Sequence, residues 1–130
     1  MTAPHRWPVR VYYEDTDLAG LVYYANYLKF IERARSEMVR TLGIDQAAMR
    51  ADGFVFAVTR IEADYLKPAK FDDALIVETR LASAGKVRCE MAQEVLRDGV
   101  PLFRADVTLA CLDVSGRPRR LPAALADVVP

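Results

Sequence analysis

The sequence predicts an α+β fold in which an antiparallel sheet wraps around one long central helix. Two patterns support this prediction. Residues 23–42 repeat their apolar side chains with the period of a helix, and four later segments alternate apolar and polar residues with the period of a strand. Short links join the last three strands, which favours an antiparallel meander. The apolar face of such a sheet must be buried against another layer, and the long helix is the element available to cover it.

The elements before the sheet can be assigned in order. Residues 8–14 are rich in Val and Tyr and are predicted to form a strand, which a loop over 15–21 follows. The long helix is apolar on one side and charged on the other. Its predicted apolar stripe consists of Tyr24, Tyr27, Leu28, Ile31, Ala34, Met38 and Leu42. Gly43 stands where helices commonly end with a glycine, and a short helical turn is predicted over 45–51.

The four later strands lie within residues 54–66, 75–81, 87–95 and 103–111. In the first of them the alternation is interrupted at Thr59. Its predicted core-facing residues are Val55, Ala57, Ile61, Ala63 and Tyr65. The sustained period of two predicts a sheet with one face on the core and the other toward polar surroundings.

Length and composition limit the function classes. A chain of 130 residues is expected to form a single domain over residues 1–130. With 18 acidic and 18 basic residues it carries no net charge, so no nucleic-acid partner is expected. It has no apolar run of membrane-spanning length and no N-terminal signal core, which predicts a soluble, cytoplasmic protein without membrane insertion. Cys89 and Cys111 lie in alternating apolar segments and are interpreted as reduced core thiols.

The segment around Asp17 is the candidate active site. Asp17 precedes the predicted start of the long helix at Tyr23 or Tyr24, and the first turn of a helix offers unpaired N–H groups with a partial positive charge. Those donors can hold the oxyanion that forms when a carbonyl is attacked, while the carboxylate serves as nucleophile or activates water. This chemistry suits esters and thioesters. The alternative is structural, because Asp in such a loop commonly caps a turn.

Other chemistries find less support. Glu14, Asp15 and Asp17 lack the histidine or the longer oxygen-ligand spacing of a metal site, so no metal and no cofactor are expected. The sole histidine, His5, lies at the chain terminus, which leaves Ser–His–Asp and Cys–His mechanisms without a base. The same shortage of histidine argues against a hydratase or dehydratase.

The run YYEDTDLAGLVYYANYLKFIERARSEMVR closely resembles the N-terminal motif of hot-dog-fold acyl-CoA thioesterases of the YbgC and 4-hydroxybenzoyl-CoA thioesterase family. The later segment VTRIEADYLKPAKFDDALIVETRL is similar to the family's strand, Pro-containing turn and following strand. The resemblance covers about residues 9–125. It implies the hot-dog fold, a curved antiparallel sheet around one long central helix, which agrees with the architecture read from the periodicity.

The resemblance also implies residue roles and partners. The family's catalytic carboxylate falls on Asp17, and its oxyanion donor, a backbone N–H at the start of the long helix, falls on or next to Tyr24. The substrate would be an acyl-CoA, and the protein would assemble as a homodimer or homotetramer with sites at the subunit interface. Many YbgC-like members carry histidine where this chain has Tyr24, so a role for that histidine does not carry over. The tyrosine form is closer to the hydroxybenzoyl-type members.

Substrate-contacting residues are predicted with an alternative beside each. Tyr23 and Tyr27 are expected to line the acyl pocket, or else to pack half-buried with a solvated hydroxyl. Four basic residues are predicted to bind the phosphates of coenzyme A: Lys67, Lys70, Lys86 and Arg88. The alternative is that they are solvated charges at the margin of the sheet. The competing function for the whole chain is a non-catalytic acyl-CoA-binding or scaffold protein on the same fold.

Overall fold

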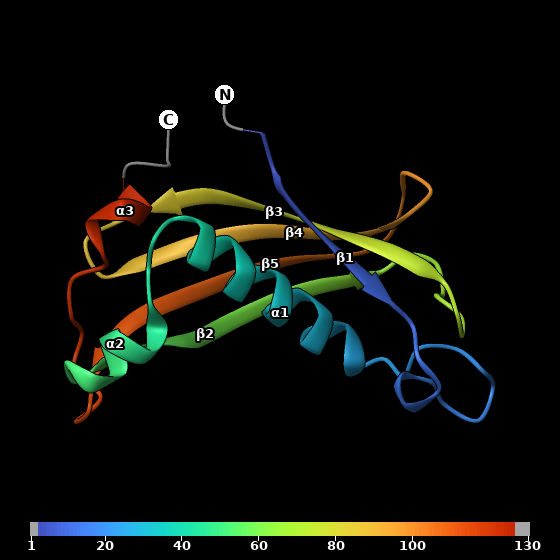
Figure 1. The fold of residues 1–130 in the computed structure, drawn as a ribbon, viewed down its shortest axis with the longest axis horizontal. Helices are drawn as coiled ribbons and strands as arrows, with labels where there is room; N and C mark the ends of the chain where they lie inside the picture. The colour runs from blue at the N-terminus through green and yellow to red at the C-terminus, as the bar shows by residue number, and fades with distance from the viewer. Residues whose placement is uncertain (1–2, 127–130) are drawn as a thin grey trace.

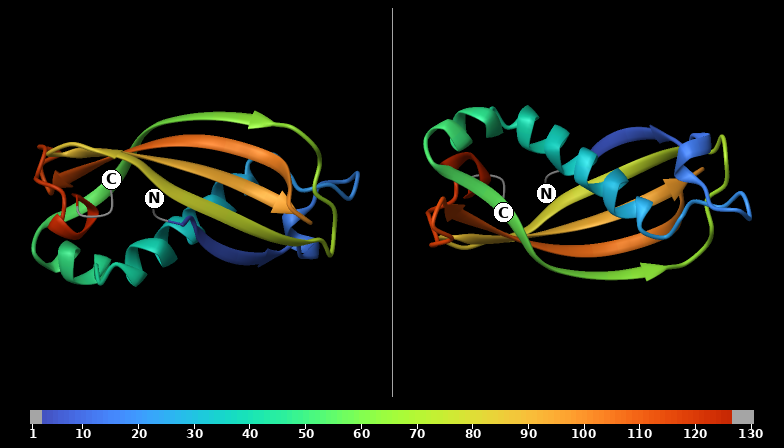
Figure 2. Two further views of the ribbon diagram at one scale, coloured as in Figure 1. Left: turned by 90° about the horizontal axis from the view of Figure 1, so that it is seen from above. Right: turned by 90° about the horizontal axis from the view of Figure 1, so that it is seen from below.

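The computed structural model describes residues 3–126. Its strands are β1 (His5–Arg10), β2 (Phe54–Tyr65), β3 (Ala74–Ala84), β4 (Arg88–Arg97) and β5 (Val100–Asp113). Its helices are α1 (Asn26–Thr41), α2 (Gln46–Ala51) and the short α3 (Ala123–Ala126), with a 3-10 turn η1 (Tyr13–Asp15) after β1. The strands form one antiparallel sheet in the order β1-β3-β4-β5-β2. The sheet curves around α1, which confirms the predicted α+β architecture and hot-dog fold (Figures 1 and 2).

Helix α1 begins later than the sequence predicts. Its first residue is Asn26 rather than Tyr23 or Tyr24, because a turn closed by the Asn26 N–H donating to the Tyr23 carbonyl (2.8 Å) precedes it. The buried stripe is also rotated from the predicted one: Tyr24 and Leu28 are exposed. The residues that α1 buries are Tyr27, Phe30, Ile31, Ala34, Arg35, Met38 and Val39. The helix ends where predicted, with Gly43 at a φ of +81° just beyond it.

The first strand differs from the predicted range. β1 ends at Arg10, and the chain turns into η1 instead of continuing as a strand to residue 14. A side chain provides the physical reason, since the Asp15 carboxylate accepts a hydrogen bond from the Tyr12 N–H (2.8 Å) and thereby closes the turn. Asp15 is itself buried.

Strand β2 contains a bulge that reverses part of its predicted orientation. The pairing with β5 shifts between Val58 and Arg60, so Thr59 is an extra residue. Phe56 pairs with the buried Cys111 and Ile61 with the buried Val107, which places Phe56 and Ile61 on the helix-facing side. Ile61 therefore packs on the core as predicted, while Ala63 and Tyr65 lie on the same face but are exposed. The prediction for Val55 and Ala57 is wrong, because the bulge moves them to the outer face.

The other strands follow the predicted alternation. Residues at every second position of β3, β4 and β5 face α1 and form the core with it. Cys89 and Cys111 are both buried free thiols, as predicted. Burial, assisted by the neighbouring Cys111, raises the pKa of the Cys89 thiol to about 11. No helix within residues 3–126 combines the length and apolar character needed to cross a membrane.

Candidate active site

Asp17 begins a tight hairpin between η1 and α1. Thr16 and Val22 pair across its base, and the Asp17 N–H donates to the Leu21 carbonyl (2.8 Å). The Gly20 N–H donates to the Asp17 carbonyl (3.0 Å), and Gly20 has a φ of +78°, a conformation that glycine adopts without steric cost. The hairpin therefore fixes the backbone of Asp17 at the molecular surface.

The Asp17 carboxylate has one engaged oxygen and one free oxygen. Oδ1 accepts hydrogen bonds from the Ala19 N–H (2.9 Å) and the Leu21 N–H (3.2 Å), so the turn-capping contact is present. Within residues 3–126 no donor reaches Oδ2, and the side chain is exposed. Capping and chemistry are compatible here, because two backbone donors orient the group while its second oxygen faces solvent.

Asp15 connects this hairpin to the start of α1. Its carbonyl accepts hydrogen bonds from the Tyr23 N–H (2.9 Å) and the Asn26 side-chain amide (2.9 Å). The segment from Tyr23 to Asn26 is thus held against the loop that carries Asp17. Glu14 is an exposed residue of η1, and Asp15 is engaged in backbone contacts. Of the three acids, Asp17 is therefore the one whose exposed carboxylate is held in place by the turn.

Tyr24 occupies the turn immediately before α1. Its N–H has no acceptor in the described part of the chain, whereas its carbonyl accepts a hydrogen bond from the Tyr65 hydroxyl (2.8 Å). The Tyr24 side chain is 63% exposed. Although the helix starts at Asn26, the predicted donor position therefore retains an unpaired N–H of the kind that can hold an oxyanion.

The connection between β2 and β3 supports the hairpin from the other side. Leu21 pairs with Lys70, and the Val22 N–H donates to the Ala69 carbonyl (2.9 Å). Asp73 accepts hydrogen bonds from the Lys70 N–H (2.8 Å) and the Arg97 guanidinium (2.7 Å). Burial pushes the pKa of Asp73 upward, but these two donors and their charges outweigh it and hold that pKa below its ordinary value.

The two predicted pocket tyrosines differ in environment. Tyr27 is 3% exposed, its ring stacks on Phe103 (centroids 4.9 Å apart), and its hydroxyl accepts the Ala69 N–H (3.0 Å). Burial is the main reason that the pKa of Tyr27 is raised. Tyr23 is 46% exposed and its ring lies 4.9 Å from that of Tyr24. Of the two, Tyr23 presents a surface that a substrate can reach in this chain.

The four predicted basic residues lie at two ends of the sheet. Lys67 and Lys70 belong to the β2–β3 connection beside the Asp17 hairpin. Lys86 and Arg88 lie where β3 turns into β4, at the opposite end of the sheet from Arg97 and the hairpin (Figure 1). At ~3.3 Å per residue, strand β4 separates Arg88 from Arg97 by roughly 30 Å. Of the four, Lys67 and Lys70 therefore lie at the end of the sheet that carries the Asp17 hairpin.

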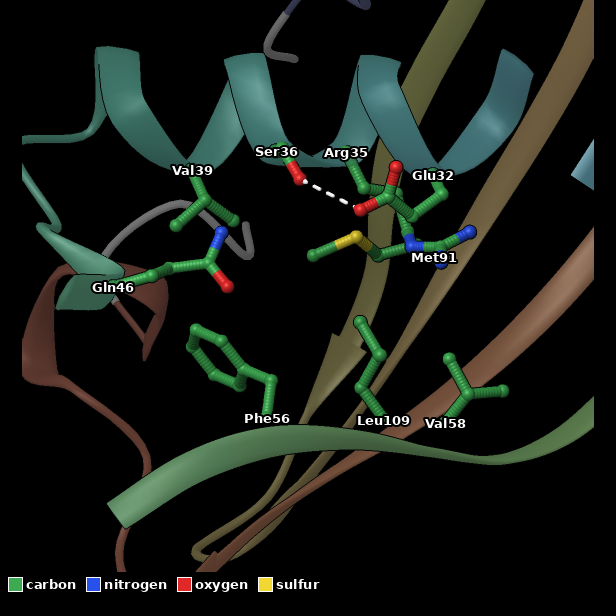
Figure 3. Close-up of a pocket in the computed structure, with 9 residues that line it drawn as sticks. All are labelled: Glu32, Arg35, Ser36, Val39, Gln46, Phe56, Val58, Met91 and Leu109. Carbon is green, nitrogen blue, oxygen red and sulfur yellow. Dashed lines mark hydrogen bonds between the residues drawn. The ribbon is translucent and has the colours of Figure 1, made fainter. Parts of the chain in front are cut away.

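A pocket opens between α1 and the sheet, away from the Asp17 hairpin (Figure 3). Its volume is about 150 Å³, the size of cavity that holds a molecule such as benzene. It is lined by Glu32, Arg35, Ser36, Val39, Gln46, Phe56, Val58, Met91 and Leu109, none of which is a predicted site residue. Arg35 is buried, which lowers its pKa, and it donates to the Gln93 side chain (3.0 Å).

Sequence reasoning missed two polar residues that shape the site and a third that anchors α1 to the sheet. Tyr65 contacts the Tyr24 carbonyl, Asp73 holds the β2–β3 connection, and Gln93 anchors Arg35 and α1. A tyrosine at the end of a strand, next to a Pro-containing turn, indicates a hydroxyl that forms a hydrogen bond, but the sequence does not identify its partner. A glutamine at a core-facing strand position similarly signals a buried hydrogen-bond network. The described residues bring together no group of three or more His, Cys, Asp or Glu side chains suited to a metal ion.

Comparison with known proteins places this fold and loop in a family. A model of the thioesterase-like superfamily matches residues 11–129. The acyl-CoA thioester hydrolase YbgC of Escherichia coli O6:H1 is 39% identical over 126 residues, covering 95% of this chain and 94% of its own. The acyl-CoA thioesterase YbgC of Haemophilus influenzae is 42% identical over 109 residues, 83% of this chain and 80% of its own. The crystal structure of a probable thioesterase from Bartonella henselae superposes with a TM-score of 0.88 at 38% identity, covering 92% of this chain and all of that one.

The chain therefore belongs to the thioesterase-like superfamily. The family predicted from the motif around Asp17 is confirmed, and so is the predicted enzyme class, a thioester hydrolase. The likeness extends over nearly the whole length of the chain and of the relatives, so it includes the hairpin, α1 and the sheet together.

Proposed function

We propose that the protein hydrolyses the thioester of an acyl-CoA, with Asp17 as the reacting carboxylate and the Tyr24 N–H as oxyanion donor. The observation that carries this proposal is that one short segment holds both a backbone-oriented carboxylate and, among the described residues, an N–H without an acceptor. No donor in the described part of the chain reaches Asp17 Oδ2, and Asp15 holds the Tyr24 turn against the same loop. The names of the YbgC relatives supply the class of thioester.

The proposed reaction needs these two groups and water. In one route Asp17 takes a proton from water as the water oxygen attacks the thioester carbonyl. In the other, the Asp17 carboxylate attacks first and water then hydrolyses the resulting anhydride. In either route the negatively charged carbonyl oxygen accepts a hydrogen bond from the Tyr24 N–H. The C–S bond then breaks, and the coenzyme A thiolate leaves and takes up a proton. The products are the free acid and coenzyme A, and the proposal requires no further cofactor.

Basic residues near the hairpin suit the phosphates of coenzyme A. Lys67 and Lys70 stand on the connection that pairs with Leu21, so they are the proposed contacts from the same chain as Asp17. Lys86 and Arg88 lie at the far end of the sheet and would serve a site that includes a second copy. The exposed ring of Tyr23 is a proposed contact for the acyl or pantetheine portion.

The edges of the sheet support self-association as a homodimer or homotetramer. Edge strand β1 is short, six residues, and contains Pro8, both of which discourage pairing with another chain. Edge strand β2 has twelve residues and no proline, and exposes Val55 and Val58. On either side of its bulge at Thr59 this edge offers unpaired backbone groups to another strand, and a second copy of β2 is the partner we propose. Sedimentation should give the mass of a dimer or tetramer, and a monomer at micromolar concentration would contradict the proposal.

A second function has one observation in its favour. Because Asp17 also caps its turn, a protein that only binds acyl-CoA would retain this residue. A thiol-release assay on a panel of short, long and aromatic acyl-CoAs separates the two functions. Release from any member supports hydrolysis and names the acyl class. Binding of acyl-CoA in a titration without release from any member would support the binding protein instead.

A further inference from the structure

We infer that Tyr65 is a positioning residue for the proposed oxyanion donor, the Tyr24 N–H, and for the neighbouring Ala25 N–H, acting through the peptide between Tyr24 and Ala25. The inference rests on the proposed function, since it assigns a role in that same site. Tyr65 is the last residue of β2, and its hydroxyl donates a hydrogen bond of 2.8 Å to the Tyr24 carbonyl. This contact joins the edge strand of the sheet to the turn before α1, across 41 residues of sequence.

The contact acts on the part of the turn that other bonds leave free. The Tyr23 N–H donates to Asp15, and the Asn26 N–H donates to the Tyr23 carbonyl, so both ends of the turn are fixed. In the described residues, neither the Tyr24 N–H nor the Ala25 N–H has an acceptor. The peptide between Tyr24 and Ala25 is therefore held by the Tyr65 hydroxyl at its carbonyl and presents a free N–H at its other side.

Peptide geometry links that carbonyl to the donors. In a trans peptide the carbonyl and the N–H point in opposite directions, so fixing the Tyr24 carbonyl toward Tyr65 directs the Ala25 N–H away from it. The hydrogen bond from Tyr65 also limits rotation of the Tyr24 backbone and so restricts the direction of the Tyr24 N–H. A hydrogen bond accepted by the carbonyl also polarises the N–H of the same peptide. Tyr65 thus prepares the donors before substrate arrives, which is the arrangement that stabilises an oxyanion most effectively.

The hydroxyl has a rigid support and the right protonation state. The Tyr65 ring packs edge-to-face on Phe103 (5.0 Å) and on the buried Tyr27 (5.6 Å), which fixes its direction. Burial, together with the neighbouring Tyr24, raises the pKa of Tyr65 above its ordinary value. The hydroxyl therefore keeps its proton at neutral pH and remains a donor.

The test is Tyr65→Phe, which removes the hydroxyl and keeps the ring packing. We expect kcat for acyl-CoA hydrolysis to fall about 10-fold with KM nearly unchanged, since the lost contact positions a transition-state donor rather than the substrate. The ¹⁵N resonance of the Ala25 amide should shift, because its peptide carbonyl loses a hydrogen bond. Tyr13→Phe is the matched control, as it removes an exposed hydroxyl at the same end of the molecule.

The outcomes separate failure of this inference from failure of the proposed function. An active wild type whose kcat is unchanged in Tyr65→Phe would overturn the inference and leave the proposed function intact. An unshifted Ala25 amide would overturn it as well, because the contact would then not act on that peptide. A kcat loss of equal size in Tyr13→Phe would show a general loss of activity and would also count against the inference. A wild type without thiol release would refute the proposed function itself.

Discussion

Replacing Tyr27 with Phe tests whether this residue supports the fold or contacts the substrate. Both the Tyr27 side chain, 3% exposed, and Ala69, 0% exposed, lie in the core, and the Tyr27 hydroxyl accepts the Ala69 N–H at 3.0 Å. The substitution keeps the ring on Phe103 but leaves that N–H buried without an acceptor. An unsatisfied buried donor costs about 1–3 kcal/mol of unfolding free energy. At about 4 °C per kcal/mol for a chain of this size, the melting temperature should fall by roughly 4–12 °C.

The assay is thermal unfolding of wild type and Tyr27→Phe, with KM for an acyl-CoA measured on both. We expect the loss of stability with KM within about twofold of wild type, because the Tyr27 side chain is 3% exposed and its hydroxyl lies out of reach of a substrate at the surface of this chain. A melting temperature unchanged by the substitution, together with a large rise in KM, would refute this reasoning. It would instead place the hydroxyl of Tyr27 in the acyl pocket.

Two further predictions concern polar contacts, one beside the Asp17 hairpin and one between α1 and the sheet. Asp73→Asn should lower the unfolding free energy by about 1–2 kcal/mol at pH 7, because it removes the charge facing Arg97. The pKa of folded Asp73 lies below its ordinary value, so this difference in unfolding free energy should persist above about pH 4 and vanish as pH falls through the folded pKa. Urea unfolding of both proteins at pH 7 and pH 3 would show the loss. An equal difference at both pH values would contradict the prediction. Gln93→Leu should lower the unfolding free energy by about 2–4 kcal/mol, because it leaves Arg35 buried without its amide partner. Adding Arg35→Met to the same chain should recover part of that loss, and purely additive effects of the two substitutions would contradict the coupling.

The fold was largely predictable because its elements keep their periods. The apolar stripe of α1 and the alternation in β3, β4 and β5 identify a helix and a sheet from the sequence, and short links identify the meander. The errors fall where a local contact overrides the period. The Asp15 carboxylate closes η1 and ends β1 early, and the extra residue Thr59 changes which side of β2 faces the core.

The site was predictable only in part, for a similar reason. The motif locates Asp17 and the neighbourhood of the oxyanion donor within one short segment. The start of α1 at Asn26 depends on a turn that the Asp15 carbonyl and Tyr65 hold, and Tyr65 comes from a distant strand. Contacts of that kind depend on strand register, which no single segment encodes. The separation of Lys86 and Arg88 from Asp17 likewise became evident only once β3 and β4 were placed in the sheet.

The central claim is that Asp17 performs the chemistry rather than only capping its turn. The most direct test measures thiol release by Asp17→Asn and wild type on one acyl-CoA, with melting temperatures alongside. Asparagine keeps an oxygen at Oδ1 for the Ala19 and Leu21 N–H groups, so the fold should survive. We predict a loss of at least about 10²-fold in kcat with a melting temperature near wild type. A rate near wild type, or a modest rate loss that accompanies a large loss of stability, would contradict the claim and leave Asp17 with a structural role.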